Sequence, residues 1–297
     1  MRSAVAPLLA LILLQGCVTA PDGSPYARAE AESLSPVTLA KLGPHLHESS
    51  GLALVDGQLW TMNDSGGEAE LTRLELPVGR STALALQGAI NFDWEALAQS
   101  AEHLFIVDCG NNRGDRIWLQ LYQIELGALV ESGAQAARTD FRFADVEYAV
   151  NRRAHNNDCE AATWVGDQLW LFTKNWDDQA TRLYRMVPGV HKQQISSSER
   201  FYTDGLVTGA DYSEAHQMLA LLGYGKGLRV LQPFIWLVPV TDRAPQWGRA
   251  KRYLLNESGQ WEAIVWRGSE LLISREESVL GGAEIARVSL PIAALSH

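Results

Sequence analysis

Five residues that recur at one position of a repeated sequence pattern could together bind a metal ion. The pattern is an apolar segment, a turn and a second apolar segment, and its first segments begin at Ser50, Glu95, Glu160, Thr208 and Glu262. If these positions converge, the three carboxylates repel one another and require protons or a cation. Ca²⁺ takes about six to eight oxygen ligands and fits this set, which holds none of the His or Cys ligands typical of zinc and copper. The alternative is a wet channel in which the glutamates bind only water and backbone N–H groups.

The spacing of the repeats predicts the fold that would bring these positions together. In four copies the second apolar segment starts nine residues after the first, and in the remaining copy it starts eleven residues after. Successive copies begin 45, 65, 48 and 54 residues apart, near the length of a four-stranded propeller blade. We therefore predict an all-β fold, a five-bladed β-propeller of four-stranded antiparallel blades whose last blade is completed by an N-terminal strand within residues 37–46. The alternative is a six-bladed ring with a divergent blade in the 65-residue interval.

Further polar residues are predicted around the mouth of the channel, because the first strand of each blade lines the axis of a propeller. The candidates for acid–base chemistry or water positioning are Asp64, Asp93, Asp108 and Asp158. The candidates for binding a small polar ligand are Lys174, Arg275, Asn111 and Asn112. The alternative for each Asp and Asn is that it forms one of the tight turns that blades need.

Two cysteines, Cys109 and Cys159, are predicted to lie at the same face of neighbouring blades. A disulfide between them is possible in an oxidising compartment. A role for either cysteine as a nucleophile is less favoured, because His155 is the only basic partner near in sequence.

The N-terminus resembles the signal of a bacterial lipoprotein. This signal consists of a basic start, an apolar run over residues 4–14 and the sequence Leu14-Gln15-Gly16-Cys17. The apolar run is shorter than the roughly 20 residues of a membrane span. The resemblance implies a signal peptide over residues 1–16, acyl chains such as palmitate on Cys17, a tether over 17–36 and a propeller domain over 37–297. It also implies an outer-membrane lipoprotein whose body lies in the periplasm. The alternative is an ordinary cleaved signal with a coincidental cysteine.

The charge balance bears on the partners. The chain has 25 Lys and Arg against 35 Asp and Glu, a formal net charge of −10. Such a protein gains no counterion release from a phosphate backbone, so nucleic acid is not an expected partner. An anionic substrate could still bind locally through a metal.

Four segments resemble a widespread family of secreted bacterial propeller proteins. They are Ser49-Ser50-Gly51-Leu52-Ala53, Trp60-Thr61-Met62-Asn63-Asp64-Ser65-Gly66, Asp93-Trp94-Glu95 and Asp108-Cys109-Gly110-Asn111-Asn112. A looser similarity is to the five-bladed calcium-activated nucleotidases, or apyrases, and it implies a central Ca²⁺ at the five ring positions. The Asn63-Asp64-Ser65-Gly66 turn is similar in kind to the apyrase Asp-Asp-Arg-Thr-Gly turn but lacks its Arg, so nucleotide hydrolysis does not follow from the resemblance.

Two functions follow as hypotheses. The first is a Ca²⁺-dependent hydrolase of a phosphate ester or a similar polar substrate. The second is a binding scaffold with a structural Ca²⁺ whose broad face docks an envelope protein or a glycan. A glycosidase is a third option, which needs two carboxylates at a defined separation. The fold alone does not choose among these functions.

Overall fold

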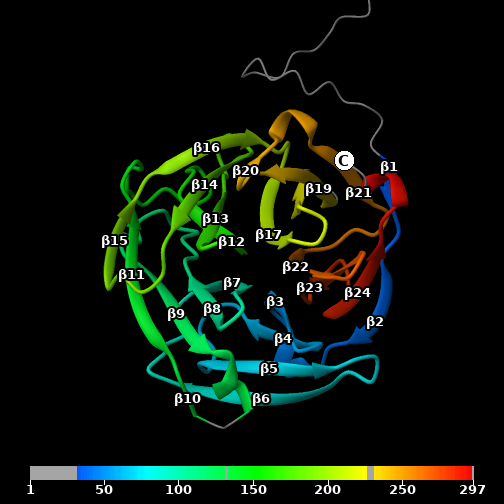
Figure 1. Cartoon of the computed structure of the whole chain (residues 1–297), viewed down its shortest axis with the longest axis horizontal. Helices are drawn as coiled ribbons and strands as arrows, with labels where there is room; N and C mark the ends of the chain where they lie inside the picture. The colour runs from blue at the N-terminus through cyan, green and yellow to red at the C-terminus, as the bar shows by residue number, and fades with distance from the viewer. Residues whose placement is uncertain (1–31, 131–132, 226–230, 296–297) are drawn as a thin grey trace, which may run out of the picture. The chain divides into compact units, whose positions relative to one another are not determined.

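The protein, in a computed structural model, is described over residues 32–130, 133–225 and 231–295. Within these residues the strands form five separate sheets arranged around a central axis (Figure 1). The predicted five-bladed β-propeller is therefore confirmed. The interval between Glu95 and Glu160 holds the strands of a single blade and a long loop, so the six-bladed alternative is wrong.

Each blade is a sheet whose strands follow one another from the axis outward. Blade 1 contains β3 (Ser49–Val55), β4 (Gln58–Asn63), β5 (Glu70–Glu75) and β6 (Arg80–Gln87). Blade 2 contains β7 (Trp94–Gln99), β8 (His103–Asp108), β9 (Leu119–Glu125) and β11 (Ala137–Phe143). Blade 3 contains β12 (Asp158–Val165), β13 (Gln168–Lys174), β14 (Ala180–Met186) and β16 (Ser197–Tyr202). Blade 4 contains β17 (Leu206–Ser213), β18 (Met218–Gly225), β19 (Gln232–Thr241) and β21 (Lys251–Leu255). Blade 5 contains β22 (Trp261–Arg267), β23 (Glu270–Arg275), β24 (Glu284–Ser289) and β2 (Val37–Lys41).

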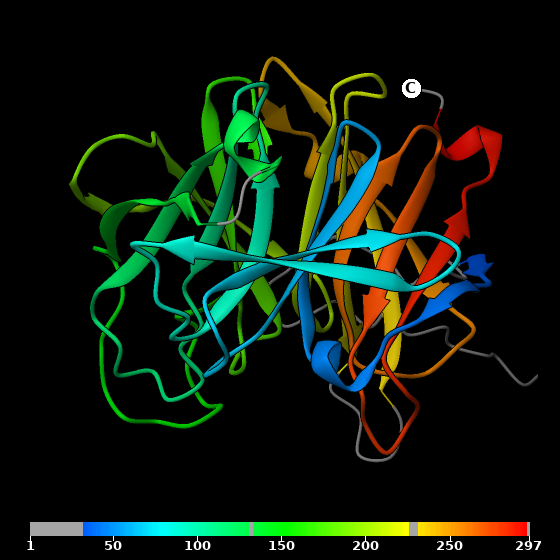
Figure 2. The same cartoon turned by 90° about the horizontal axis from the view of Figure 1, so that it is seen from below.

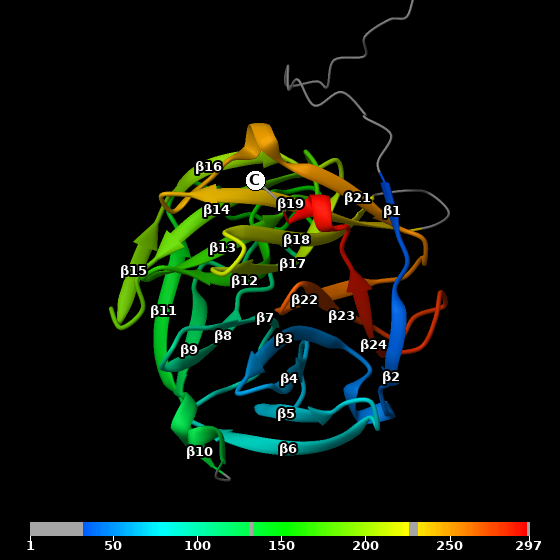
Figure 3. The same cartoon turned by 45° about the vertical axis from the view of Figure 1, so that its right-hand side comes forward.

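The N-terminal strand closes the ring. β2 pairs antiparallel with β24, as predicted, and so supplies the outermost strand of blade 5. The strand before it, β1 (Glu32–Leu34), pairs in parallel with β21 of blade 4, so the propeller begins at Glu32, inside the segment predicted as tether. Figure 3 shows β1 and β2 running in succession along the edges of these two blades. The predicted signal peptide, Cys17 and the rest of the tether lie outside the described residues.

Short additional strands cover other outer edges. β10 (Ala134–Gln135) pairs with β6 of blade 1, and β15 (Lys192–Ile195) pairs with β11 of blade 2, both in parallel. β20 (Ala244–Pro245) pairs with β19. Covered edges leave fewer unpaired backbone groups that could template association with another chain.

The helical content of the described residues is limited to short 3-10 segments, none of them long and apolar enough to cross a membrane. They are η1 (Pro44–Leu46), η2 (Leu126–Val130), η3 (Trp247–Arg249) and η4 (Ile292–Ala294). In Figure 2 the blades are seen from the side, and η1, which directly precedes β3, lies on the lower face.

The hydrophobic core lies between adjacent blades. One cluster joins blades 1 and 2 through Met62, Trp94 and Tyr122, and another joins blades 4 and 5 through Leu222, Trp261 and Ile273. Inner strands such as β8 and β13 are buried on both faces and so read as continuous apolar runs, whereas the outer strand β6 alternates between buried and exposed residues. The apolar runs are what made the repeat visible in the sequence.

Candidate functional site

A β-bulge near the start of every innermost strand sets one residue apart from the strand pairing. In each blade the register between the first and second strands skips one residue of the first strand, and the skipped residues are Ser50, Glu95, Glu160, Thr208 and Glu262. A bulge leaves its extra residue unpaired and re-aims the side chain. All five residues line one axial pocket of about 160 Å³. The structure thus brings the predicted ring positions together.

The two hydroxyls of the ring tie neighbouring blades together. Ser50 Oγ donates a hydrogen bond to the carbonyl of Trp94 at 2.9 Å, and Thr208 Oγ1 donates one to the carbonyl of Trp261 at 2.7 Å. Each acceptor is the residue before a ring glutamate of the next blade. The hydroxyl hydrogens are therefore used within the protein, while the oxygen lone pairs remain available as acceptors.

A second ring of pocket residues comes from the ends of the second strands. Its members lie fourteen positions after the ring residue of their blade, or sixteen in the longer hairpin of blade 4, and are Asp64, Lys174, Tyr224 and Glu276. The equivalent residue of blade 2 is Cys109, which forms a disulfide with Cys159. Tyr224 and Glu276 were missed by the sequence analysis, although the constant offset would have found Glu276.

Arg275 lies one residue before this second ring, and the structure places it away from the pocket. Consecutive strand residues point to opposite faces of a sheet. The Arg275 guanidinium is paired with Glu257 at 2.6 Å and with Glu284 at 3.1 Å. The charge of Arg275, predicted as a ligand-binding group, is thus paired within the protein, and Arg275 does not line the pocket.

Lys174 neutralises one side of the pocket. Its ammonium lies 3.0 Å from Glu160 Oε2, and both side chains are almost fully buried. Burial alone would lower the pKa of Lys174, but Glu160, Tyr224 and Glu262 together raise it well above its ordinary value. Lys174 is thus a permanent internal counter-charge for this side of the ring.

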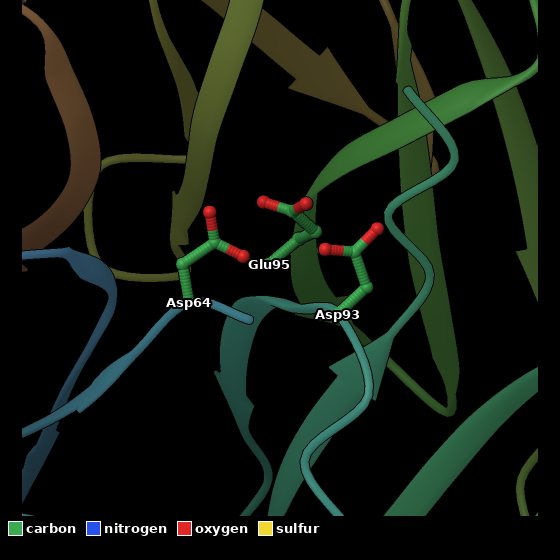
Figure 4. A group of neighbouring side chains, drawn as sticks. All are labelled: Asp64, Asp93 and Glu95. Atoms are coloured by element: carbon green, nitrogen blue, oxygen red, sulfur yellow. The ribbon is translucent and has the colours of Figure 1, made fainter. Parts of the chain in front are cut away.

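Three carboxylates gather without such a counter-charge on the other side. Asp64, Asp93 and Glu95 each place one oxygen within 4.8 Å of the others, and Figure 4 shows the three side chains close together, Glu95 from β7 and the two aspartates from segments that adjoin strands. The Glu95 side chain is buried, and within the described residues no hydrogen bond or ion pair reaches its carboxylate. Asp64 Oδ1 is also buried without a hydrogen-bond partner in this part of the chain.

The electrostatics of this cluster favour protons or a bound cation. Burial raises the pKa of Glu95 well above its ordinary value, and the carboxylates of Asp64, Glu160 and Asp93 raise it further. Burial, together with Asp93 and Glu262, raises the pKa of Asp64 to about 8. Burial raises the pKa of Asp93 to about 6, although the Arg116 guanidinium opposes the shift.

Asp108 and its neighbours hold the cluster in place instead of facing the pocket. The buried Asp108 carboxylate accepts hydrogen bonds from the backbone N–H groups of Phe92 and Asp93 and is paired with Arg116. Gly110 packs against the cluster so closely that a Cβ there would lie 2.2 Å from Glu95 Oε1. Asp108 is therefore a positioning residue for Asp93, in place of its predicted acid–base role.

Asp158 and Asn111 form a similar support between blades 2 and 3. Asp158 accepts hydrogen bonds from the Asn111 backbone N–H at 2.6 Å and from Trp176 Nε1 at 2.7 Å. The Asn111 side chain is buried and bonds the backbone of Arg116 and Asn157. Neither residue lines the pocket, where catalysis and ligand binding were predicted for them, and both form hydrogen bonds that support the loop between blades 2 and 3. Asn112 does line the pocket.

Comparisons with known proteins do not assign the chain to a family. No protein-family model matches the chain, and no curated protein matches it in sequence. Solved structures that align with part of the chain include Kuenenia stuttgartiensis hydrazine synthase (TM-score 0.43, 11% identity, 77% of this chain and 56% of that one). Others are U3-55K (TM-score 0.40, 10% identity, 85% and 98%) and a putative 6-phosphogluconolactonase from Bacteroides uniformis (TM-score 0.41, 10% identity, 80% and 83%). The chain spans little more than half the length of the hydrazine synthase chain it matches.

Proposed function

We propose that the axial pocket binds Ca²⁺ at Asp64, Asp93 and Glu95 and that the protein uses the bound ion to bind and hydrolyse a small polar substrate such as a phosphate ester. The observation that carries the proposal is a group of three carboxylates, with Glu95 buried and Asp64 and Asp93 half-buried, that has no ion-pair partner within the described residues and borders the pocket through Asp64 and Glu95. Such a group must be neutralised, and oxygen-only ligands favour a hard cation.

The arrangement of the carboxylates is compatible with one shared cation, because Asp64, Asp93 and Glu95 each place one oxygen within 4.8 Å of the others. Ca²⁺ takes about six to eight oxygen ligands in flexible geometry, whereas Mg²⁺ demands near-ideal octahedral geometry. An irregular set of carboxylates therefore suits Ca²⁺ better than Mg²⁺.

The proposed ion position differs from the centre of the ring expected from the sequence. Lys174 pairs with Glu160 and its charge also acts on Glu262, so this side of the pocket already holds one positive charge. The remaining ring glutamate, Glu95, joins Asp64 and Asp93. Ser50 and Thr208, which use their hydrogens within the protein, complete the wall of the pocket.

The pocket also offers groups for hydrolysis. A bound calcium ion would polarise an ester oxygen or a water molecule. Glu276, whose pKa is raised to about 9 by burial and by Glu262 and Asp64, holds a proton at neutral pH and could donate it to a leaving group. The protonated Glu276 carboxyl lines the same pocket as Asp64 and Glu95, two of the proposed calcium ligands.

The size of the pocket supports a second candidate, a scaffold in which Ca²⁺ is structural. A volume of about 160 Å³ is below the range of about 300–1,000 Å³ typical of sites that enclose a whole ligand. In this alternative the broad face would dock an envelope protein or a glycan. Either function is compatible with the lipid anchor proposed at Cys17, which would hold the body at the outer membrane.

Calorimetric titration of the full chain with Ca²⁺ and with Mg²⁺ tests the site. We expect wild type to bind Ca²⁺ more tightly than Mg²⁺ and Glu95→Gln to lose at least about tenfold in Ca²⁺ affinity, while the exposed control Glu102→Gln, with the same change in charge, binds as wild type. Wild type that binds neither ion would refute the calcium site. Calcium binding without release of phosphate from aryl phosphate esters would favour the scaffold.

A further inference from the structure

Arg153 places an available positive charge at the pocket. Its side chain lines the same pocket as Asp64 and Glu95, and its guanidinium carbon lies 5.0 Å from the centroid of the Trp176 ring. Within the described residues no carboxylate or carbonyl forms an ion pair or hydrogen bond with this guanidinium. Lys174, by contrast, is fully engaged with Glu160. The donors of Arg153 are therefore available to a ligand.

The backbone at Arg153 is held in a conformation that favours glycine. Its φ is 54°, in the left-handed region. The turn around it is fixed by reciprocal hydrogen bonds between Asn151 and Ala154 and by the bond from the Asn151 N–H to the carbonyl of Arg113. These bonds fix the position of Arg153 at the rim of the pocket, and the positive φ makes glycine a well-tolerated replacement there.

Two positive groups would then border the same pocket. Arg153 has a planar fork of N–H donors, which matches the paired oxygens of a phosphate or carboxylate. A cation at Asp64, Asp93 and Glu95 would bind a further oxygen of the same group. The small volume of the pocket suits one tetrahedral head group whose remainder stays outside.

We infer that the substrate is a dianionic phosphate monoester, whose phosphate bridges the bound cation and the Arg153 guanidinium. This inference rests on the proposed function, because it takes the calcium site at Asp64, Asp93 and Glu95 as one half of the substrate-binding site. A phosphodiester, with a single charge and two substituents, leaves fewer oxygens for the fork. A neutral sugar offers no charge to Arg153.

Two substitutions at Arg153 and one at its neighbour test the inference. Arg153→Gly removes the guanidinium and suits the backbone conformation, and Arg153→Gln removes the charge while keeping a long polar side chain. Arg152→Gln is the matched control, since Arg152 is the adjacent exposed arginine and does not line the pocket. The probe is phenylphosphonate, a non-hydrolysable mimic of a phosphate monoester, and benzoate serves as the carboxylate arm.

Titrations of the full chain in saturating Ca²⁺ give the readout. We expect phenylphosphonate to bind wild type more tightly than benzoate, and both Arg153 variants to lose about 10- to 100-fold in affinity for it, as for a charge-assisted hydrogen bond. Arg152→Gln should bind as wild type, and Ca²⁺ affinity should change by less than about threefold in every variant, since Arg153 is not a metal ligand.

The outcomes separate the inference from the proposed function. If Ca²⁺ binds but phenylphosphonate affinity does not depend on Arg153, or benzoate binds better, the inference is overturned and the calcium site stands. If wild type binds no Ca²⁺, the proposed function is refuted and the bridged phosphate with it. Loss of phenylphosphonate binding in Arg152→Gln as well would also overturn the inference, because the effect would then be one of general surface charge.

Discussion

Replacing Lys174 by Met should destabilise the protein strongly, because the substitution leaves Glu160 buried without its counter-charge. The ammonium and the carboxylate are 3.0 Å apart and 7% and 5% exposed. With an effective dielectric constant of about 20, their attraction is about 5 kcal/mol, and removal of one partner from a buried pair costs about 3–5 kcal/mol. We therefore expect Lys174→Met to lower the free energy of unfolding by about 3–5 kcal/mol in the absence of Ca²⁺.

The double variant Lys174→Met/Glu160→Gln separates the ion pair from simple packing. Removal of both charges from a buried pair is often close to neutral, so the double variant should recover to within about 1–2 kcal/mol of wild type. Lys251→Met is the matched control: Lys251 is exposed on β21, and its replacement should change stability by less than about 0.5 kcal/mol.

Urea unfolding followed by the fluorescence of the ten tryptophans measures these differences with and without Ca²⁺. In Lys174→Met, Glu160 and Glu262 lack a cation, so Ca²⁺ should restore more stability to this variant than it adds to wild type. A loss below about 1 kcal/mol, or a double variant as unstable as the single one, would refute the view that Lys174 is the resident counter-charge.

Three further predictions follow from the same geometry. Gly110→Ala should weaken Ca²⁺ binding by at least about tenfold, because the added Cβ would collide with Glu95 Oε1. The control Gly248→Ala should bind Ca²⁺ as wild type does, since its Cβ meets no atom within 4 Å. Equal Ca²⁺ affinities of the two variants in calorimetry would contradict this prediction. Asp211 accepts hydrogen bonds from Thr163 Oγ1 and the Trp266 N–H, and burial raises its pKa from 3.8 to about 6. The folded state therefore binds this proton more tightly than the unfolded state, so from pH 4 to pH 7 wild type should lose about 2 kcal/mol of stability relative to Asp211→Asn. A difference that is constant with pH in urea titrations would argue against it. Replacing both Cys109 and Cys159 by Ala opens a loop of 50 residues and should lower the free energy of unfolding by about 4 kcal/mol, a value that a loss under 1 kcal/mol would rule out.

The fold and the first ring were predictable because they depend on local pattern. Inner strands buried on both faces give apolar runs at a fixed offset, and the offset places Glu95, Glu160 and Glu262 at equivalent points. A β-bulge leaves each of these glutamates unpaired. One copy of the repeat does not reveal this bulge in the sequence, but the bulge occupies the same position in every blade.

The pairing of charges across the pocket was not predictable in the same way. Lys174 and Arg275 are both basic residues at the end of a second strand, but they lie fourteen and thirteen residues after their ring glutamates, so one faces Glu160 in the pocket and the other faces Glu284. The offset distinguishes their faces, whereas the partner of each charge comes from the tertiary structure. The convergence of Asp64 with Asp93 depends on loop paths that join different blades, and Arg153 lies in a loop that has no counterpart in the repeat.

The pairing of β1 with blade 4 has a mechanical consequence. The chain enters the propeller at Glu32, lies along β21 for three residues, and only then reaches β2, which closes blade 5. Tension applied through the preceding residues would load the β1–β21 pairing and the Asn256 bonds to Leu34 and Ser35 before it reached the ring closure. Under such tension the pairing of Glu32–Leu34 would have to break before the load reached β2 and the closure of the ring.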